Sequence, residues 1–176
     1  MRIALISDTH GYLDQALLDA IAGCDEIWHA GDVGTSSVLD LLEAAQKPIR
    51  VVWGNIDGNA VRLRSAEWLC FEADGVKVCM THIGGYPPKY AAGVKAKLTK
   101  LHPDVFICGH SHVLRVMRDP MLAGMLYLNP GAVGIEGFHK VRTLLRFSIE
   151  NSTIKELEVV ELGKRARGHN LAEMLP

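Results

Sequence analysis

The first half of the chain alternates short apolar segments with segments of helical periodicity, and this alternation restricts the fold more than any other feature. Three apolar runs predict buried strands at residues 2–7, 26–30 and 49–53. Residues 13–21 carry one apolar helical stripe, and Ser37 with Asp40 has the spacing of a capping box at the start of a second helix. Because a β-α-β-α-β order implies parallel strands joined by right-handed crossovers, we expect an α/β fold.

The second half of the chain changes to hairpin patterns. Strand-like segments at residues 68–72 and 76–80 flank an Asp-Gly turn, and a helix carrying Tyr90, Val94 and Leu98 is expected after Pro87-Pro88. Further strands are predicted at residues 105–108, 114–118, 125–128, 143–149 and 154–160. The chain therefore reads as a two-sheet α/β sandwich, with one domain over residues 1–162 and a polar, solvated tail over residues 163–176, which includes Arg167.

Composition excludes several classes of protein. The 48% hydrophobic and 22% charged residues are typical of a globular chain, and a formal charge of −1 gives no basic excess for nucleic-acid binding. No apolar run approaches the roughly 20 residues that span a bilayer, and Ser7-Asp8 interrupts the N-terminal run too early for a signal peptide. We expect a cytoplasmic protein without a membrane partner.

The cysteines give the same expectation about the compartment. They show no C-x-x-C spacing, and most lie in apolar, strand-like surroundings: Cys24, Cys70, Cys79 and Cys108. Buried free thiols in a reducing compartment are favoured over a disulfide framework.

Polar residues of metal-binding types follow the ends of five predicted strands. The blocks are Asp8-Thr9-His10, Gly31-Asp32, Gly54-Asn55-Ile56-Asp57, Thr81-His82 and Gly109-His110-Ser111-His112. In a largely parallel α/β sheet the carboxyl ends of the strands meet at one edge, where ligands bind. A single block is more often a helix cap or a turn, but five successive blocks are poorly explained in that way. In extended chain, residues i and i+2 point the same way, so both D-x-H and H-x-H offer two ligands to one side.

The ligand types indicate a pair of divalent ions. Carboxylate with imidazole suits manganese, iron, nickel, cobalt or zinc, and the absence of thiolates argues against a structural zinc site. Seven ligands exceed the need of one ion, whereas two ions about 3.5 Å apart, bridged by a carboxylate, would use them all.

In this order and spacing, the five blocks resemble the calcineurin-like binuclear metallophosphoesterases over about residues 1–160. The short chain and the Asn129-Pro130-Gly131 turn are most similar to the small single-domain phosphodiesterases of bacteria and archaea. The resemblance implies an α/β two-layer β-sandwich of mixed sheets flanked by helices. It also implies a hydrolase for a small phosphoester, in which a hydroxide between two metals attacks phosphorus in line; manganese is the favoured metal.

The resemblance assigns a role to each motif residue. Asp8, His10, Asp32 and His112 would hold the first metal. Asp32 would bridge to a second metal held also by Asn55, His82 and His110. Asp32, Asn55 and His82 are the expected catalytic residues, and Asn55 would steady the phosphate oxygens.

The sequence departs from larger relatives after the motif asparagine. Many of them carry a histidine there, proposed as a general acid, whereas Ile56 has no proton to donate. We therefore expect activated phosphodiesters with aryl leaving groups to react best. Asp57 is interpreted as a turn residue in preference to a residue that supports a ligand, and His29 as a core or supporting residue. No role is assigned to His102, His139 or His169.

Two other functions stay open at this point. One is a non-catalytic scaffold of the same fold that binds partner proteins, as the retromer subunit is understood to do. The other is a phosphomonoesterase or nucleotide phosphatase that uses the same metals, with substrate choice decided in the loops at residues 84–90 and 114–125. Self-association into a homo-oligomer is also left open.

Overall fold

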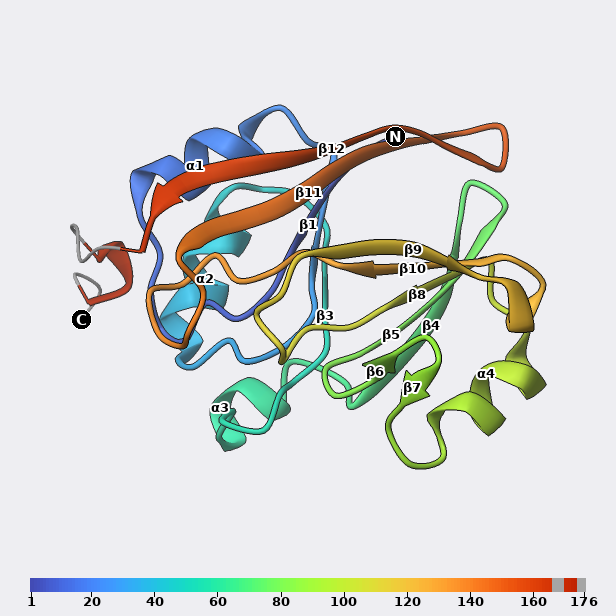
Figure 1. Ribbon diagram of the computed structural model, residues 1–176. Coiled ribbons are helices and arrows are strands. Elements are labelled where there is room, and N and C mark those ends of the chain that lie inside the picture. Colours follow the sequence, from blue (N-terminus) through green and yellow to red (C-terminus); the bar gives the residue numbers. More distant parts are fainter. Residues whose placement is uncertain (166–169, 174–176) are drawn as a thin grey trace.

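Two five-stranded mixed sheets packed face to face form the body of the molecule in the computed structural model, which describes residues 1–165 and 170–173 (Figure 1). The first sheet has the order β12-β11-β1-β2-β3. Its strands are β1 (Arg2–Ile6), β2 (Glu26–His29), β3 (Ile49–Val51), β11 (Val141–Glu150) and β12 (Thr153–Lys164). The second sheet has the order β4-β5-β8-β10-β9. Its strands are β4 (Trp68–Ala73), β5 (Val76–Thr81), β8 (Val105–Ile107), β9 (Arg115–Asp119) and β10 (Met125–Asn129).

Each sheet contains three parallel strands, which are flanked by antiparallel strands on one side in the first sheet and on both sides in the second. Strands β1, β2 and β3 are parallel, as are β5, β8 and β10, whereas β11, β12, β4 and β9 pair in antiparallel fashion. The predicted β-α-β-α-β order and the two-layer sandwich of mixed sheets are confirmed. The parallel strands are what bring several strand ends to one edge of the sandwich.

Helices cover the outer faces of the sheets (Figure 1). The described helices are α1 (Gln15–Ala22), α2 (Ser36–Ala44), α3 (Asn59–Arg62), α4 (Val94–Leu101) and the short 3₁₀ turns η1 (Pro120–Leu122) and η2 (Leu171–Glu173). The apolar stripes of α1 and α2 pack on the outer face of the first sheet, and α4 packs on the second. None of these helices is long and apolar enough to cross a membrane.

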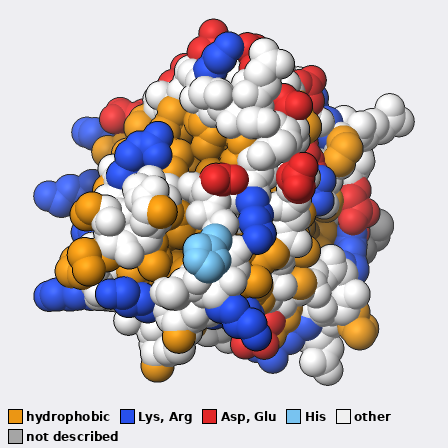
Figure 2. Space-filling view, turned by 90° about the vertical axis from the view of Figure 1, so that its right-hand side faces the viewer, with side chains coloured by type: hydrophobic (Ala, Val, Ile, Leu, Met, Phe, Trp, Pro, Cys, Tyr) orange, Lys and Arg blue, Asp and Glu red, His pale blue; other side chains and the backbone are white. Residues whose placement is uncertain are grey.

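The core between the sheets is built around large buried side chains. Trp28 of β2 lies in edge contact with Phe71 of β4 and Phe147 of β11, with ring centroids 4.9 and 5.6 Å apart. Full burial of such a side chain stabilises the fold by about 1.5–3 kcal/mol. Figure 2 shows one outer face, on which basic, acidic and hydrophobic side chains are intermixed.

Two predicted helix starts are wrong. Helix α2 begins at Ser36, and its N-cap is Thr35, which has an extended backbone. The Thr35 side chain makes no capping hydrogen bond, and the predicted capping box at Ser37 is absent. Helix α4 begins at Val94 because Gly93, at φ 76°, has a left-handed backbone that cannot continue a helix. Tyr90 belongs instead to β7 (Lys89–Tyr90), which pairs with β6 (Gly85–Tyr86).

The expectation of four free thiols is also wrong. Cys70 and Cys79 form a disulfide across the β4–β5 hairpin, where they are directly opposed and their Cα atoms are 4.3 Å apart. Opposed residues of an antiparallel pair approach closely enough for such a bond. Cys24 and Cys108 are free and buried. The cysteines as a set therefore no longer argue for a reducing compartment.

Part of the predicted C-terminal tail packs against the domain, whereas residues 163–165 are exposed. Strand β12 continues to Lys164, and Asn170 binds the chain after β1: its Oδ1 accepts from the Leu13 amide at 3.0 Å and its Nδ2 donates to the Gly11 carbonyl at 2.9 Å. Ala172 is buried. The predicted boundary at residue 162 stays a prediction, and Arg167 and His169 lie outside the described residues.

Candidate metal centre

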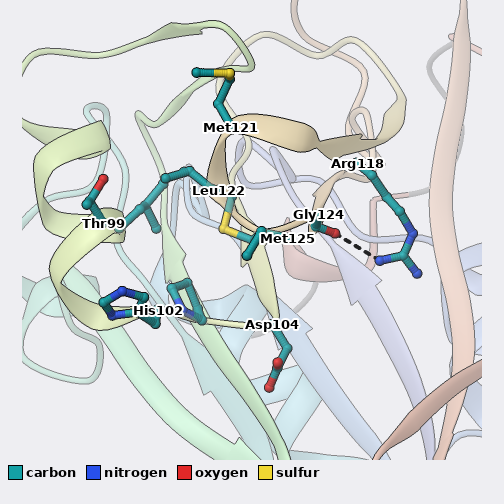
Figure 3. A pocket seen from close by; sticks show the side chains of 11 residues that line it. Thr99, His102, Asp104, Arg118, Met121, Leu122, Gly124 and Met125 are labelled. Carbon is teal, nitrogen blue, oxygen red and sulfur yellow. Dashed lines mark hydrogen bonds between the residues drawn. The ribbon is translucent and has the colours of Figure 1, made fainter.

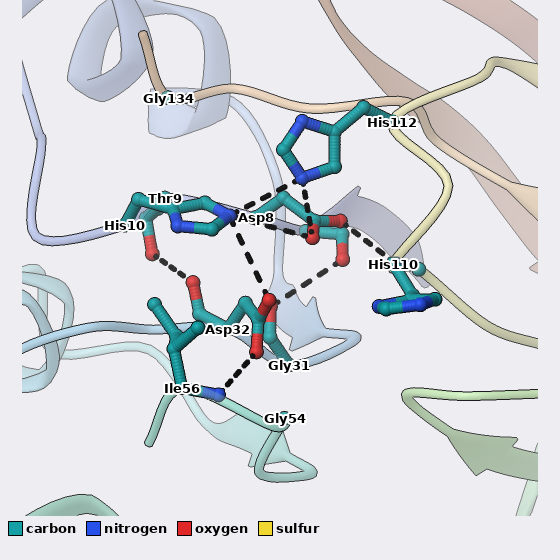
Figure 4. Close-up of polar contacts among 12 residues, drawn as sticks. Asp8, Thr9, His10, Gly31, Asp32, Gly54, Ile56, His110, His112 and Gly134 are labelled. Atoms are coloured by element: carbon teal, nitrogen blue, oxygen red, sulfur yellow. Dashed lines mark hydrogen bonds and ion pairs between the residues drawn. The ribbon is translucent and has the colours of Figure 1, made fainter. Parts of the chain in front are cut away.

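The loops after the parallel strands bring most of the predicted ligands together (Figure 4). Two groups form, and within each group one possible ligand atom per residue lies within 4.8 Å of the others. The first group is Asp8, His10 and His112, and the second group is Asp32, His82 and His110. These residues come from the ends of β1, β2, β5 and β8, as the strand-end pattern predicts.

The first group is tightly clustered around a buried carboxylate. Asp8 Oδ1 lies 3.1 Å from His112 Nε2 and 3.8 Å from His10 Nε2, and the two imidazole nitrogens are 3.2 Å apart. Asp8 is fully buried, and both histidines are half-buried. Three ligand atoms thus face one point.

Asp32 lies between the two groups. Its Oδ2 is 3.2 Å from His82 Nε2 and 3.7 Å from His10 Nε2, so one carboxylate contacts a histidine of each group. His82 is buried, and its Nδ1 bonds to the Ala30 carbonyl at 2.8 Å. Since that carbonyl only accepts, Nδ1 carries a proton, and Nε2 is the nitrogen that faces Asp32 and could bind a metal.

Two of the predicted ligands to the second metal are exposed. His110 stands at the surface with its ring 5.2 Å from that of His82. Asn55 is exposed between Gly54 and Ile56, both of which adjoin Asp32. The Ile56 amide donates to Asp32 Oδ1 at 3.2 Å, and a Cβ at Gly54 would lie 2.0 Å from the same oxygen. Gly54 therefore allows this loop to approach Asp32 closely.

The ligand residues do not have the extended backbone that the i, i+2 argument assumes. Five have positive φ values: Asp8, His10, Asp32, His110 and His112, from 50° to 67°. Asp8 and His10 do share a group, but His110 and His112 point into different groups. Such left-handed residues cost roughly 1–3 kcal/mol each and persist where surrounding contacts fix them.

The electrostatics of the centre suit cations. Burial acts to raise the pKa of Asp8, but the imidazoles of His10 and His112 outweigh it and hold that pKa below its usual range. Asp8 Oδ1 and His82 Nε2 are buried without a hydrogen-bond partner among the described residues. An ionised carboxylate and an imidazole nitrogen left unsatisfied in the same buried centre fit divalent metal ions.

Asp57 does more than the predicted turn. Its buried carboxylate accepts from the backbone amides of Val33 at 3.1 Å, Gly34 at 2.7 Å and Gly54 at 2.7 Å. It therefore ties the loop after β2, which carries Asp32, to the loop after β3. Its spacing within G-N-x-D was the available signal, because a carboxylate there can reach back to Gly54.

His29 supports the loops that carry Asp8 and Asp32, in agreement with the predicted supporting role. Its Nδ1 accepts from the Gly31 amide at 3.1 Å, so its Nε2 donates to Thr9 Oγ1 at 2.9 Å. Thr9 in turn donates to the Val33 carbonyl at 2.9 Å. Burial lowers the pKa of His29 to about 4, which keeps the ring neutral and these roles fixed.

The other histidines differ in position. His139 lies beside His112, with the two Nδ1 atoms 3.3 Å apart, a contact that sequence reasoning missed. His102 ends α4 and lines a cavity of about 550 Å³ with Asp104, Arg118 and Met121 (Figure 3). No residue of either metal group lines that cavity.

Comparison with known proteins agrees with this geometry. Residues 1–152 match the family model of the calcineurin-like phosphoesterase superfamily domain. A probable metallophosphoesterase of Methanothermobacter thermautotrophicus is 31% identical over 139 residues, covering 75% of this chain and 77% of the relative. A second, from Methanocaldococcus jannaschii, is 31% identical over 172 residues, covering 92% and 82%.

Solved structures share the fold. Vps29 from Entamoeba histolytica, complexed with zinc, matches with a TM-score of 0.71 at 19% identity over 93% of this chain and 100% of its own. An archaeal phosphodiesterase matches with a TM-score of 0.68 at 23% identity over 92% and 99%. Together, the family match, the 31% identical relatives and the two groups of ligands confirm the predicted resemblance: the chain belongs to the calcineurin-like phosphoesterase superfamily.

Proposed function

We propose that the protein is a phosphodiesterase that works with two divalent metal ions, manganese being the preferred metal. The observation that carries the proposal is the position of Asp32, whose Oδ2 contacts a histidine of each ligand group. Asp8, His10, Asp32 and His112 would hold the first ion, and Asp32, Asn55, His82 and His110 the second. When bound, such ions lower the pKa of water toward 7 and offset the negative charge of the phosphate.

The chain's own residues have two tasks in this reaction: they retain the cations, and they position the phosphate. Asp8 and Asp32 supply the negative charge that retains the cations, and His82 is oriented by its bond to Ala30. Asn55 stands exposed at the rim, where its amide can donate to an equatorial phosphate oxygen. Ile56, which is 45% exposed beside it, presents no proton to the leaving group. Leaving groups that are stable as anions are therefore favoured.

A cavity beside the metal groups supports a diester over a monoester. It measures about 280 Å³, and it is lined by the ligand His10 together with Ser37, Glu136 and Glu173. This volume lies just below the roughly 300–1,000 Å³ of sites for whole drug-sized ligands, and suits one ester arm. The two carboxylates disfavour a second anionic group there. The fold shared with an archaeal phosphodiesterase agrees with this choice.

The substrate class is tested on metal-stripped protein reloaded separately with Mn, Ni, Co, Fe, Zn or Mg. Aryl phosphodiesters are expected to be hydrolysed faster than alkyl or aryl monoesters, and most rapidly with Mn. Faster turnover of monoesters or nucleotides under all metals would instead identify a phosphomonoesterase.

The absence of an acid at position 56 is tested with aryl diesters of rising leaving-group pKa. Turnover is expected to fall steeply along the series, because the leaving oxygen departs without a proton from the enzyme. A flat dependence, with the chemical step shown to limit the rate, would place a general acid elsewhere in the site.

Chelation separates a catalyst from a scaffold. At 100 times the dissociation constant, metal binding stabilises the folded chain by about 2.7 kcal/mol, which corresponds to about 5–10 °C in melting temperature. Chelator should therefore lower the melting temperature and abolish hydrolysis, and added Mn should restore both. Restored stability without hydrolysis of any phosphoester would identify a metal-dependent scaffold.

A further inference from the structure

His139 lies in the loop between β10 and β11, against the outer side of the first metal group. Its Nδ1 is 3.3 Å from Nδ1 of His112, and its Nε2 is 3.0 Å from the Gly134 carbonyl oxygen. The two rings meet edge to face, with centroids 5.2 Å apart and planes at 64°. His139 is thus hydrogen-bonded at both nitrogens.

These two bonds fix the protons on both rings. A carbonyl oxygen only accepts, so His139 donates from Nε2 and its Nδ1 has a lone pair. His112 must then donate its Nδ1–H to His139. That leaves the lone pair of His112 on Nε2, the atom that lies 3.1 Å from Asp8 Oδ1 and 3.2 Å from His10 Nε2. The ring is presented as a ligand to the first group.

The loop that carries His139 is held against the site at several points. The Gly134 amide donates to the Asp8 carbonyl at 3.0 Å. Gly137 has φ 108°, and a Cβ there would lie 2.2 Å from His112 Nδ1, so the backbone passes directly along the imidazole. Arg165 donates to the carbonyls of Ile135 and Gly137. The loop contacts therefore hold His139 Nδ1, the acceptor for His112, in position.

We propose that His139 is a positioning residue for the first metal group: it sets the tautomer and the ring orientation of His112. The proposal rests on the proposed role of His112 as a metal ligand. Metal-binding histidines ordinarily donate their second nitrogen to an acceptor, and loss of that acceptor costs about 10–100-fold in metal affinity. In the second group, the Ala30 carbonyl performs the same task for His82.

Two variants and a control test this role. His139→Ala removes the acceptor, whereas His139→Asn can place its Oδ1 where Nδ1 of the imidazole stood. The control is His102→Asn, an exposed histidine whose left-handed backbone asparagine tolerates. Far-UV circular dichroism and melting first establish that each variant is folded. Mn²⁺ binding is then measured by calorimetry, and the tautomer of His112 by ¹⁵N NMR of metal-free protein.

The expected results are specific to an acceptor. Wild-type His112 should carry its proton on Nδ1, and His139→Ala should show mixed tautomers with about 10–100-fold weaker Mn²⁺ binding at one of the two sites. His139→Asn should recover most of the affinity, and His102→Asn should lose none.

Three results would overturn the proposal. They are a wild-type His112 protonated on Nε2, unchanged Mn²⁺ affinity in His139→Ala, or a folded His139→Asn variant that binds as poorly as His139→Ala. Failure of the proposed function is separate, because it would appear as normal Mn²⁺ binding and His112 tautomer without hydrolysis.

Discussion

The two ligand groups contain the same residue types but are built differently. In the first, Asp8 is fully buried, and His112 is backed by a side chain from a loop far along the sequence. In the second, His82 is backed by a main-chain carbonyl, while His110 stands exposed. We therefore expect the first ion to be held more tightly and the second to exchange more readily.

The difference shows two ways of fixing a ligand. Asp57 holds the loops of the second group by accepting hydrogen bonds from three backbone amides, those of Val33, Gly34 and Gly54. The first group depends on the loop at residues 133–139. Arg142 anchors this loop, because its Nε donates to the Val133 carbonyl at 2.6 Å. Arg142 also forms two hydrogen bonds with Asp14. The second group thus relies on one carboxylate that binds backbone amides, and the first group on an ion pair between two side chains.

Removing the residue that joins the two groups should have the largest effect. Asp32→Asn is expected to lower turnover by more than the about 100-fold that loss of an outer partner costs, because both ions lose a charged ligand. His10→Ala, which removes a ligand from the first group only, should be less damaging. Metal content and turnover are measured for both. An Asp32→Asn protein with two bound metals and wild-type turnover would show that Asp32 does not bridge.

Asp57→Ala removes the hydrogen bonds that hold the loops of the second group together. Three backbone amides lose a buried acceptor, and each such loss costs about 1–3 kcal/mol, so unfolding should become easier by about 3 kcal/mol or more. Urea denaturation measures the change, with Asp40→Ala as the matched control. Asp40 forms an exposed ion pair with Arg64, which is worth at most about 1 kcal/mol. Equal effects of the two substitutions would contradict the clamping role.

The stability that the Asp14–Arg142 ion pair gives to the loop of the first group should depend on pH. Burial acts to raise the pKa of Asp14, but hydrogen bonds from Arg142 and the Leu17 amide outweigh it and lower that pKa below its ordinary 3.8. The ion pair therefore stabilises the fold above the unfolded-state pKa, and its contribution is lost as pH falls through the lower folded-state value. Asp14→Asn should be less stable than wild type by about 1.5–3 kcal/mol at neutral pH. Urea midpoints measured from neutral pH to below pH 3.8 should converge; a constant gap would contradict this account.

The sequence predicts those parts of the molecule that depend on short-range patterns. Apolar runs predict the strands, and because parallel strands share one carboxyl edge, residues as distant as Asp8 and His112 could be placed together. The Cys70–Cys79 bond was also within reach. An Asp74-Gly75 turn pairs Ala73 with Val76, and counting outward from that pair sets position 70 opposite 79.

Contacts made by irregular loops could not be predicted in this way. His139 reaches His112 across 27 residues, and Asn170 reaches Gly11 across 159, and neither loop has a periodicity that fixes its path. The left-handed backbone at the ligands was likewise hidden, although aspartate, asparagine and histidine are the non-glycine residues that best tolerate it.

The left-handed backbone at the ligands has a consequence for the evolution of such sequences. At each of the five strained ligand positions a glycine would relieve backbone strain of about 1 kcal/mol or more, so a glycine substitution that destroys metal binding still carries this favourable backbone contribution. Activity and stability are therefore opposed at these positions. As long as selection acts on hydrolysis, the strain is retained; in a lineage released from that selection, a change to glycine at these positions removes strain that no longer serves a function.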